Sequence, residues 1–234
     1  MAPFVSAVTR VLITGFGPFS GVPVNPSWRI ASKLPTSLPN DIQLLVHPSY
    51  VPVAYHPVMD LLPSLHAQEP DISLHIGVAA GRTYFAVEAT SKKTGYEFSR
   101  DVDGKVFTKE EQEVAWGSEP TLHSTSLDLH AIVARWQYLT SNITFSSSDF
   151  LSSGPVAPED VKWSDAVGSY LCGFIYYASM VEMGKHRGSE GLDVAFMHVP
   201  SLDTDEQVQA GVDVTIALVQ SLVETWRAKK GGKK

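Results

Sequence analysis

Near its amino terminus the chain reads Val11-Leu12-Ile13-Thr14-Gly15, a short apolar run that ends in glycine. Such a run is typical of a buried parallel strand, and Pro26 then opens a predicted helix over residues 27–34. Further apolar runs at residues 42–46 and 71–78 predict two more strands. The alternation of strand and helix around this first strand indicates an α/β fold.

The rest of the chain continues the alternation. Helices are expected over residues 55–65, 127–139, 172–183 and 205–227, and strands over 50–53, 84–88 and 193–199. The strand at 84–88 alternates like an edge or partly exposed strand. We therefore predict a mostly parallel twisted sheet with helices on both faces, in which ligands bind beyond the carboxyl ends of the strands.

Length and composition limit the class of protein. The 234 residues are 44% hydrophobic and 18% charged, enough for one substantial core, so we expect residues 1–234 to form a single domain. The net charge of −7 argues against binding to nucleic acid or to an anionic membrane surface, because both need clustered Lys and Arg.

Two segments differ from the rest in composition. Residues 140–160 are rich in serine and predict a surface insertion, and residues 229–234 form a basic tail that we expect to be solvated. No apolar run reaches membrane-spanning length, and residues 1–10 lack the features of a signal peptide. We therefore expect a cytoplasmic protein.

The chain has a single cysteine, Cys172, followed by His198 at the end of a predicted strand. A lone thiol cannot form an intrachain disulfide and is a poor metal site, so no metal is predicted. Taken alone, Cys172 and His198 fit buried core residues and Glu88 fits a surface acid. Taken together, the three residue types suit nucleophilic catalysis, in which a carboxylate orients an imidazole that serves a thiol.

The loop after the first strand, Gly15-Phe16-Gly17-Pro18-Phe19-Ser20-Gly21, is a near miss to a dinucleotide-binding fingerprint. Pro18 removes an amide donor, and the two phenylalanines crowd the loop. One interpretation is a tight turn with two core aromatics. The other is a loop in which Phe16 and Phe19 offer flat faces to a small planar ligand, with the amide of Asn25 nearby.

Four blocks of the chain, in consistent order, resemble the pyroglutamyl peptidase I family of cysteine peptidases. They are residues 11–19 with Asn25-Pro26, residues 77–82 with Glu88, residues 166–172, and Phe196-Met197-His198-Val199-Pro200. The resemblance implies an α/β/α sandwich, a cytosolic location and no cofactor. It also implies a catalytic triad of Cys172, His198 and Glu88 that removes an N-terminal pyroglutamate (5-oxoproline) from peptides.

The residues suit that chemistry. If Cys172 lies where a loop enters a helix, the helix end would lower the pKa of its thiol, and His198 would protonate the leaving amine. Water would then hydrolyse the thioester, and backbone amides around residues 168–172 are candidates to hold the oxyanion. Phe16, Phe19, Tyr170 and Leu171 would enclose the neutral lactam ring, and a charged amino terminus would be rejected.

The sequence departs from the family pattern at Val78, Lys93 and Gly173. These departures would support a cysteine amidase acting on another small cyclic amide. Only the departures near Glu88 would support a second alternative, a non-catalytic binding protein that retains the fold. Labelling of Cys172 by iodoacetamide only at alkaline pH would favour the binding protein. Monomeric and homo-oligomeric states both remain open.

Overall fold

A computed structural model describes residues 8–145 and 154–232 of the chain. Within these residues the largest sheet has seven strands in the order β10-β5-β11-β4-β1-β3-β2. The strands of this sheet are β1 (Thr9–Gly15), β2 (Ser37–Leu38), β3 (Ile42–Val46), β4 (Ile72–Val78), β5 (Phe85–Glu88), β10 (Val161–Ser164) and β11 (Val194–Val199).

The sheet is mostly parallel, as predicted, but it contains two antiparallel pairings, one between β11 and β5 and one at the edge between β3 and β2. Strands β3, β1, β4 and β11 run parallel to one another, and β5 is parallel to β10. Strand β5, however, is antiparallel to β11, and the short β2 is antiparallel to β3. The prediction of an edge strand at residues 84–88 is wrong, because β5 lies between β11 and β10 and is buried throughout.

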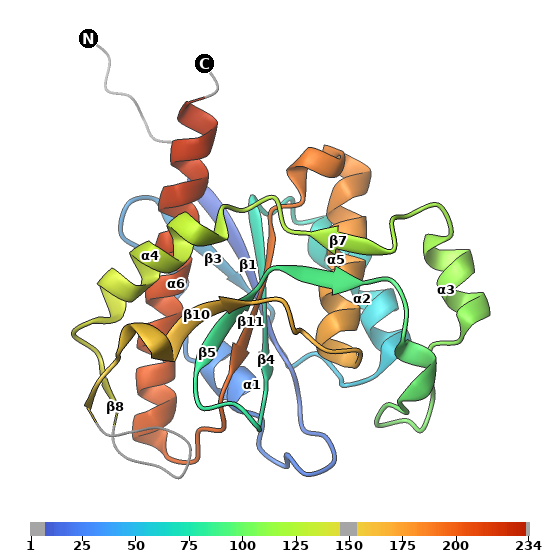
Figure 1. The fold of residues 1–234 in the computed structure, drawn as a ribbon, viewed down its shortest axis with the longest axis horizontal. Coiled ribbons are helices and arrows are strands. Elements are labelled where there is room, and N and C mark those ends of the chain that lie inside the picture. The colour runs from blue at the N-terminus through green and yellow to red at the C-terminus, as the bar shows by residue number, and fades with distance from the viewer. Residues whose placement is uncertain (1–7, 146–153, 233–234) are drawn as a thin grey trace.

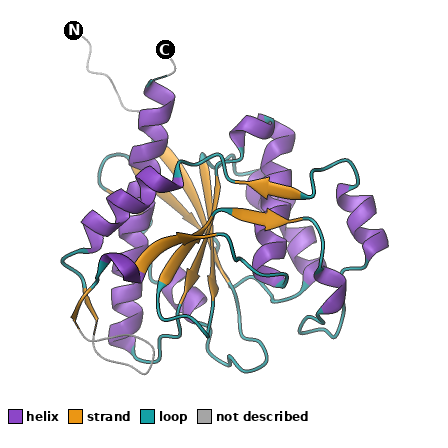
Figure 2. Ribbon diagram, viewed as in Figure 1, coloured by secondary structure: helices purple, strands orange, loops and turns teal. Residues whose placement is uncertain are grey.

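Helices cover both faces of the sheet, which confirms the α/β/α layering (Figures 1 and 2). Helices α1, α4 and α6 lie on one face, and α2 and α5 lie on the other with α3 outside them. The helices are α1 (Pro26–Ala31), α2 (Tyr55–His66), α3 (Lys109–Trp116), α4 (Leu129–Thr140), α5 (Leu171–Arg187) and α6 (Asp205–Gly231).

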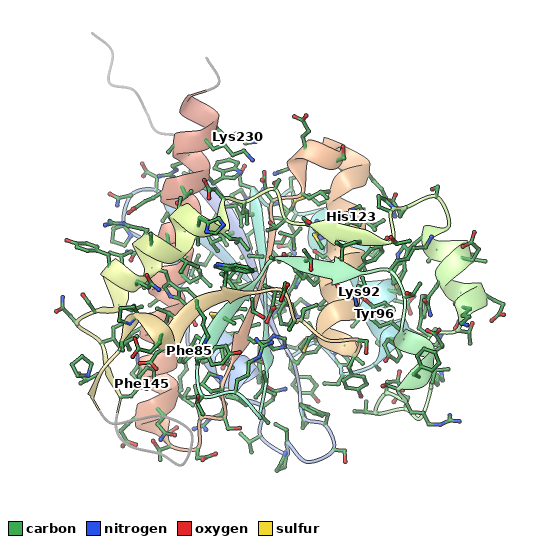
Figure 3. The ribbon with its side chains drawn as sticks, viewed as in Figure 1. Phe85, Lys92, Tyr96, His123, Phe145 and Lys230 are labelled. Carbon is green, nitrogen blue, oxygen red and sulfur yellow. The ribbon has the colours of Figure 1, made fainter. Side chains whose placement is uncertain are left out.

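Alternate side chains of each central strand pack into two different cores. On β1, Val11 and Ile13 belong to the core under α1, α4 and α6, whereas Leu12 belongs to the core under α2 and α5. Figure 3 shows Phe85 and Phe145 close together on the first side, where their rings stack. Tyr96, labelled on the other side, packs edge to face against Phe174 of α5. Both faces are apolar, so the strands read as continuous hydrophobic runs.

Several elements differ from the sequence-based expectations. Residues 50–53 form only an isolated bridge between Val51 and Phe16 instead of a strand. Helix α6 continues to Gly231 and thus takes in Lys229 and Lys230, which were expected in a solvated tail. The sequence-based prediction also missed α3, although Thr108 and Glu111 form a capping box at its start, and the small sheet of β6 (Thr90–Lys92) and β7 (Leu122–Ser124).

The serine-rich stretch is partly structured. Helix α4 runs to Thr140, and β8 (Thr144–Phe145) pairs with β9 (Gly154–Pro155). Residues 146–153, the middle of the predicted insertion, lie outside the described residues. Short 3-10 helices occur at η1 (Tyr96–Phe98), η2 (Pro158–Asp160) and η3 (Ser189–Gly191). Over residues 8–145 and 154–232, no helix has the length and apolar character needed to cross a membrane.

Candidate active site

Cys172 is the second residue of α5, at the end of the helix that faces the carboxyl edge of the parallel strands. The residue before the helix, Tyr170, supplies no side-chain cap, so the first-turn amides are free to bind another acceptor. The thiol lies against Gly77 of β4. A Cβ added at Gly77 would come within 2.9 Å of Cys172 Sγ and 2.7 Å of the Phe196 ring. Only glycine therefore leaves room for the sulfur at this point of the sheet.

His198 and Glu88 meet on the same face of the sheet. His198 on β11 is the register partner of Gly77 on β4, so the imidazole and the thiol flank the same glycine. His198 Nδ1 lies 2.7 Å from Glu88 Oε1. Glu88 is fully buried and His198 is 4% exposed. The ionised carboxylate accepts the Nδ1 proton, which leaves Nε2 with its lone pair.

Arg82 is a further member of this cluster that sequence reasoning did not single out. Its guanidinium donates to Glu88 Oε1 at 2.6 Å and to the carbonyl of Ala166 at 2.7 Å. The backbone amide of Ala166 donates to the second carboxylate oxygen of Glu88 at 3.2 Å. Arg82 thus ties the buried carboxylate to the loop that leads into α5 and Cys172. The six-residue spacing from Arg82 to Glu88 was the signal available in the sequence.

The charges of the cluster set the pKa values of its members. Burial alone would raise the pKa of Glu88, but the hydrogen bonds from His198 and Arg82 outweigh burial and lower it. Burial lowers the pKa of His198, and the opposing effect of Glu88 only partly offsets it. Glu88 is therefore ionised at neutral pH, and His198 is neutral and able to accept a proton.

The backbone hydrogen bond at Cys172 acts to lower the pKa of the thiol, as expected of a helix start, but the expected net lowering does not occur because burial outweighs it. Burial raises the pKa of the Cys172 thiol to about 12, and the negative charge of Glu88 adds to that effect, while Arg82 opposes it. Part of the side chain still faces the adjacent cavity. The site thus holds a neutral thiol beside a neutral imidazole, rather than a preformed ion pair.

A cavity of about 420 Å³ opens in front of Cys172. The five predicted substrate-binding residues, Phe16, Phe19, Asn25, Tyr170 and Leu171, all line this cavity together with Cys172. The remaining wall residues are Ser20, Gly21, Val22, Val53, Val78, Ala80 and Val167. No side chain in this lining carries a formal charge. We refer to this cavity as the acyl pocket.

The glycine-containing loop shapes one wall of the acyl pocket. Phe16 is 3% exposed and belongs to the core, and it also lines the pocket. The side chain of Asn25 donates to the carbonyl of Gly17 at 2.9 Å and accepts from the amide of Ser27. Asn25 therefore caps α1 and braces the loop. A Cβ at Gly17 would lie 2.3 Å from the ring of the half-exposed Tyr50, so that ring would have to move.

The three departures from the family pattern have different consequences. Val78 lines the acyl pocket. Lys93 does not line it; its ammonium donates to the carbonyl of Gly117 at 3.0 Å, near the end of α3. Gly173 packs so closely that a Cβ would lie 2.2 Å from the carbonyl oxygen of Gly168, whose φ is +85°. Gly173 thus lets the loop before α5 fold back on the first turn of the helix.

A larger cavity of about 640 Å³ lies near the other end of α5. Its walls include His66, Glu182, His186 and Arg187, and none of its residues borders the acyl pocket. By volume alone this cavity would be the better candidate for the active site, but its lining contains no nucleophilic side chain with an adjacent base. Among residues 8–145 and 154–232, no group of three or more His, Cys, Asp or Glu residues is arranged to hold a metal ion.

Comparison with known proteins decides the family. The model of the family described as pyroglutamyl peptidase matches residues 9–147, more than half of the chain. The chain belongs to the pyroglutamyl peptidase family. The matched span includes Phe16, Phe19 and Glu88 and ends before Cys172 and His198. The placement of these last two side chains therefore comes from the structure.

Curated relatives and solved structures agree with this family. The chain is 29% identical over 194 residues to pyroglutamyl-peptidase 1 of Mus musculus, with 82% of this chain and 79% of the relative covered. It is 28% identical to the pyrrolidone-carboxylate peptidase of Pyrococcus furiosus, with 82% and 80% covered. The crystal structure of pyrrolidone carboxyl peptidase from that organism superposes with a TM-score of 0.73 at 22% identity, covering 93% of this chain and all of the other. The family fold is thus preserved.

Proposed function

We propose that this protein is a cysteine peptidase that hydrolyses the amide bond after an N-terminal pyroglutamyl residue. Membership of the pyroglutamyl peptidase family and the names of its relatives support the substrate class. The observation that carries the mechanism is the hydrogen-bonded set of His198, Glu88 and Arg82 near Cys172, whose thiol lines an uncharged pocket. Because these residues come from β4–β5, β11 and α5, we propose that the chain acts as one catalytic unit.

The acyl pocket explains how the substrate would be selected. A pyroglutamyl group is a small lactam without a charged amine, and the aromatic and aliphatic walls at Phe16, Phe19, Tyr170 and Leu171 suit it. An ordinary peptide would bring an ammonium group into a pocket that has no carboxylate to pair with it. Burying that charge unpaired costs about several kcal/mol, enough to exclude such peptides.

The first chemical step transfers the acyl group to sulfur. Since the Cys172 thiol is neutral, His198 Nε2 takes its proton as Sγ attacks the pyroglutamyl carbonyl carbon. Uncapped amides in the first turn of α5 would bind the oxyanion of the tetrahedral intermediate. His198 then gives the proton to the leaving nitrogen, so the C–N bond breaks and a thioester remains on Cys172.

The second step releases the acid. His198, neutral again, accepts a proton from a water molecule that attacks the thioester carbon. The C–S bond breaks, the sulfur regains the proton from His198, and free pyroglutamate leaves. Glu88 holds the imidazole in the tautomer that both steps require and stabilises its cationic form.

The test is a hydrolysis assay that compares pyroglutamyl aminocoumarin amide with prolyl aminocoumarin amide. We expect release of aminocoumarin from the pyroglutamyl compound alone, and only in the presence of a reducing agent that keeps Cys172 as a thiol. Activity on a different cyclic acyl group would favour the amidase alternative. No hydrolysis of any such amide would favour the binding protein.

Iodoacetamide labelling does not separate these alternatives as the sequence suggested. Burial raises the pKa of Cys172 to about 12, so slow labelling at neutral pH is expected even of a catalytic thiol. Hydrolysis is therefore the measurement that discriminates between an enzyme and a binding protein.

A further inference from the structure

A second cavity of about 230 Å³ adjoins the acyl pocket. The two share four wall residues, Gly21, Val22, Val78 and Ala80. The remaining walls of the second cavity are formed by Pro23, Val24, Pro26, Arg29, Ser201, Leu202 and Asp203. It thus lies on the α1 and α6 side of the carboxyl edge of the sheet, whereas the acyl pocket lies on the α5 side.

The position of His198 indicates which way a bound peptide would run. With the pyroglutamyl ring in the acyl pocket and its carbonyl at Cys172, the leaving nitrogen must approach His198 to receive a proton. From His198, β11 ends at Val199 and the chain continues into residues 201–203, which form a wall of the second cavity. The amide of Ala79 donates to the carbonyl of Val199 at 2.9 Å, which holds the β4 loop beside this exit. Because the second cavity shares wall residues with the acyl pocket and continues along these residues, it is the neighbouring space that a residue beyond the scissile bond can reach.

The two cavities differ in charge. The second cavity is lined by two charged side chains, Arg29 and Asp203. Arg29 is already neutralised, because its guanidinium donates to Asp205 Oδ1 at 2.7 Å and to the carbonyl of Leu202 at 3.3 Å. The carboxylate of Asp203 is exposed and makes no hydrogen bond or ion pair with any residue in 8–145 or 154–232, although its backbone amide donates to Gln207.

We propose that this second cavity binds the residue that follows the scissile bond, and that Asp203 gives the enzyme a preference for a basic side chain at that position. The proposal rests on the proposed function. The unpaired carboxylate would pair with a Lys or Arg side chain of the peptide, and the net charge of −7 would favour the approach of such peptides. Because Asp203 is exposed, the preference should be modest and sensitive to salt.

The experiment compares two peptides that differ only in charge, pyroglutamyl-lysine amide and pyroglutamyl-N-acetyllysine amide. The kcat/KM for release of the amino acid amide is measured for the wild type, for Asp203→Asn and for Asp213→Asn. Asp213 is an exposed residue of α6 outside both cavities and serves as the matched control. We expect the wild type and Asp213→Asn to prefer the lysine peptide about two- to fivefold at low salt, and Asp203→Asn to show no preference.

Salt provides a second measurement that needs no variant. The preference of the wild type should fall toward one as the ionic strength rises from about 0.01 M to 1 M, because the Debye length then shrinks from about 30 Å to about 3 Å. A wild type that does not prefer lysine, or a preference that persists in Asp203→Asn, would overturn the proposal while leaving the proposed function intact. If the wild type hydrolyses neither peptide, the proposed function itself fails.

Discussion

Two buried histidines on neighbouring strands, His198 on β11 and His75 on β4, have different surroundings. The imidazole of His75 is hydrogen-bonded to two hydroxyl groups, with Nδ1 2.7 Å from Thr14 Oγ1 and Nε2 2.8 Å from Ser179 Oγ. Both of its nitrogens are therefore occupied. Burial and the nearby His66 lower the pKa of His75 to about 3.

His198 has a carboxylate partner on one nitrogen only. Glu88 holds Nδ1 and partly counteracts the loss of hydration, and Nε2 keeps its lone pair. A histidine held between two hydroxyls is a structural link between sheet and helix. A histidine oriented by an ionised carboxylate, with its second nitrogen free, is suited to proton transfer. The comparison teaches that the partner, rather than burial, distinguishes the two roles.

The largest effect is expected from the two groups that exchange the proton. Cys172→Ser and His198→Ala should each lower kcat/KM for the pyroglutamyl aminocoumarin amide by at least about 10³-fold. Cys172→Ser should change the thermal unfolding midpoint little, because it exchanges only sulfur for oxygen, whereas His198→Ala also removes the hydrogen bond to buried Glu88 and the ring contact with Phe196 and should lower the midpoint moderately. Activity retained in purified Cys172→Ser protein would remove the proposed nucleophile.

Glu88→Gln should have a smaller effect, about 10- to 100-fold on kcat, since Glu88 orients the imidazole but exchanges no bond with the substrate. The charge of Glu88 raises the pKa of His198, so its loss lowers that pKa further. His198 must be neutral to accept the thiol proton, and activity falls as pH drops through its pKa. The acid limb of the kcat/KM profile should therefore move to lower pH in Glu88→Gln. A loss as large as that of Cys172→Ser would contradict the assigned roles.

Arg82→Gln should lower kcat about three- to tenfold, because Glu88 keeps its contacts with His198 and Ala166. Arg82 lowers the pKa of His198, so the acid limb should move to higher pH, opposite to the shift in Glu88→Gln. Arg82→Lys keeps the positive charge but loses the planar guanidinium that bonds both Glu88 and Ala166. It should therefore restore the pH of the acid limb more fully than it restores kcat. If the limb does not move in Arg82→Gln, Arg82 is only a structural link.

His75→Gln should leave kcat within about twofold and act on stability instead. Since burial holds the pKa of His75 at about 3, the unfolded chain binds this proton more tightly from about pH 6.5 downward. The contribution of His75 to stability is thus complete above about pH 6.5 and is lost as pH falls. Urea unfolding at pH 7 and pH 5 should show a smaller acid-induced loss in His75→Gln than in the wild type. A large loss of kcat would mean that the His75 network belongs to the active site.

The sequence was sufficient for the parts of the site that lie at strand ends and at the start of a helix. Cys172, His198 and the aromatic loop could be placed because a parallel sheet brings its carboxyl ends and the following loops to one edge. Glu88 was proposed as a triad member, but the direction of its strand was not predicted. Glu88 belongs to β5, which runs antiparallel to β11 and lies between β11 and β10. Its side chain therefore reaches His198 from a neighbouring strand inside the sheet and not from a loop at the carboxyl edge.

A signal for that reversal was present in the sequence. Only residues 79–84 separate β4 from β5, and a parallel crossover needs about a dozen residues or more. Other features could not be predicted from one chain. The pKa of Cys172 depends on how tightly the neighbouring strands enclose the sulfur. The close approach of the Gly168 carbonyl to Gly173 depends on the path of the loop before α5. Both follow from three-dimensional packing rather than from local pattern.

The most direct test of the account is affinity labelling with pyroglutamyl chloromethyl ketone at neutral pH, followed by peptide mapping with mass spectrometry. We expect one adduct, on Cys172, that a pyroglutamyl peptide prevents and that forms much more slowly in His198→Ala. We also expect little reaction with the prolyl analogue, because the acyl pocket rejects a charged ring nitrogen. An adduct at another residue, or equal rates for the two reagents, would contradict the claim that Cys172 and His198 serve this pocket.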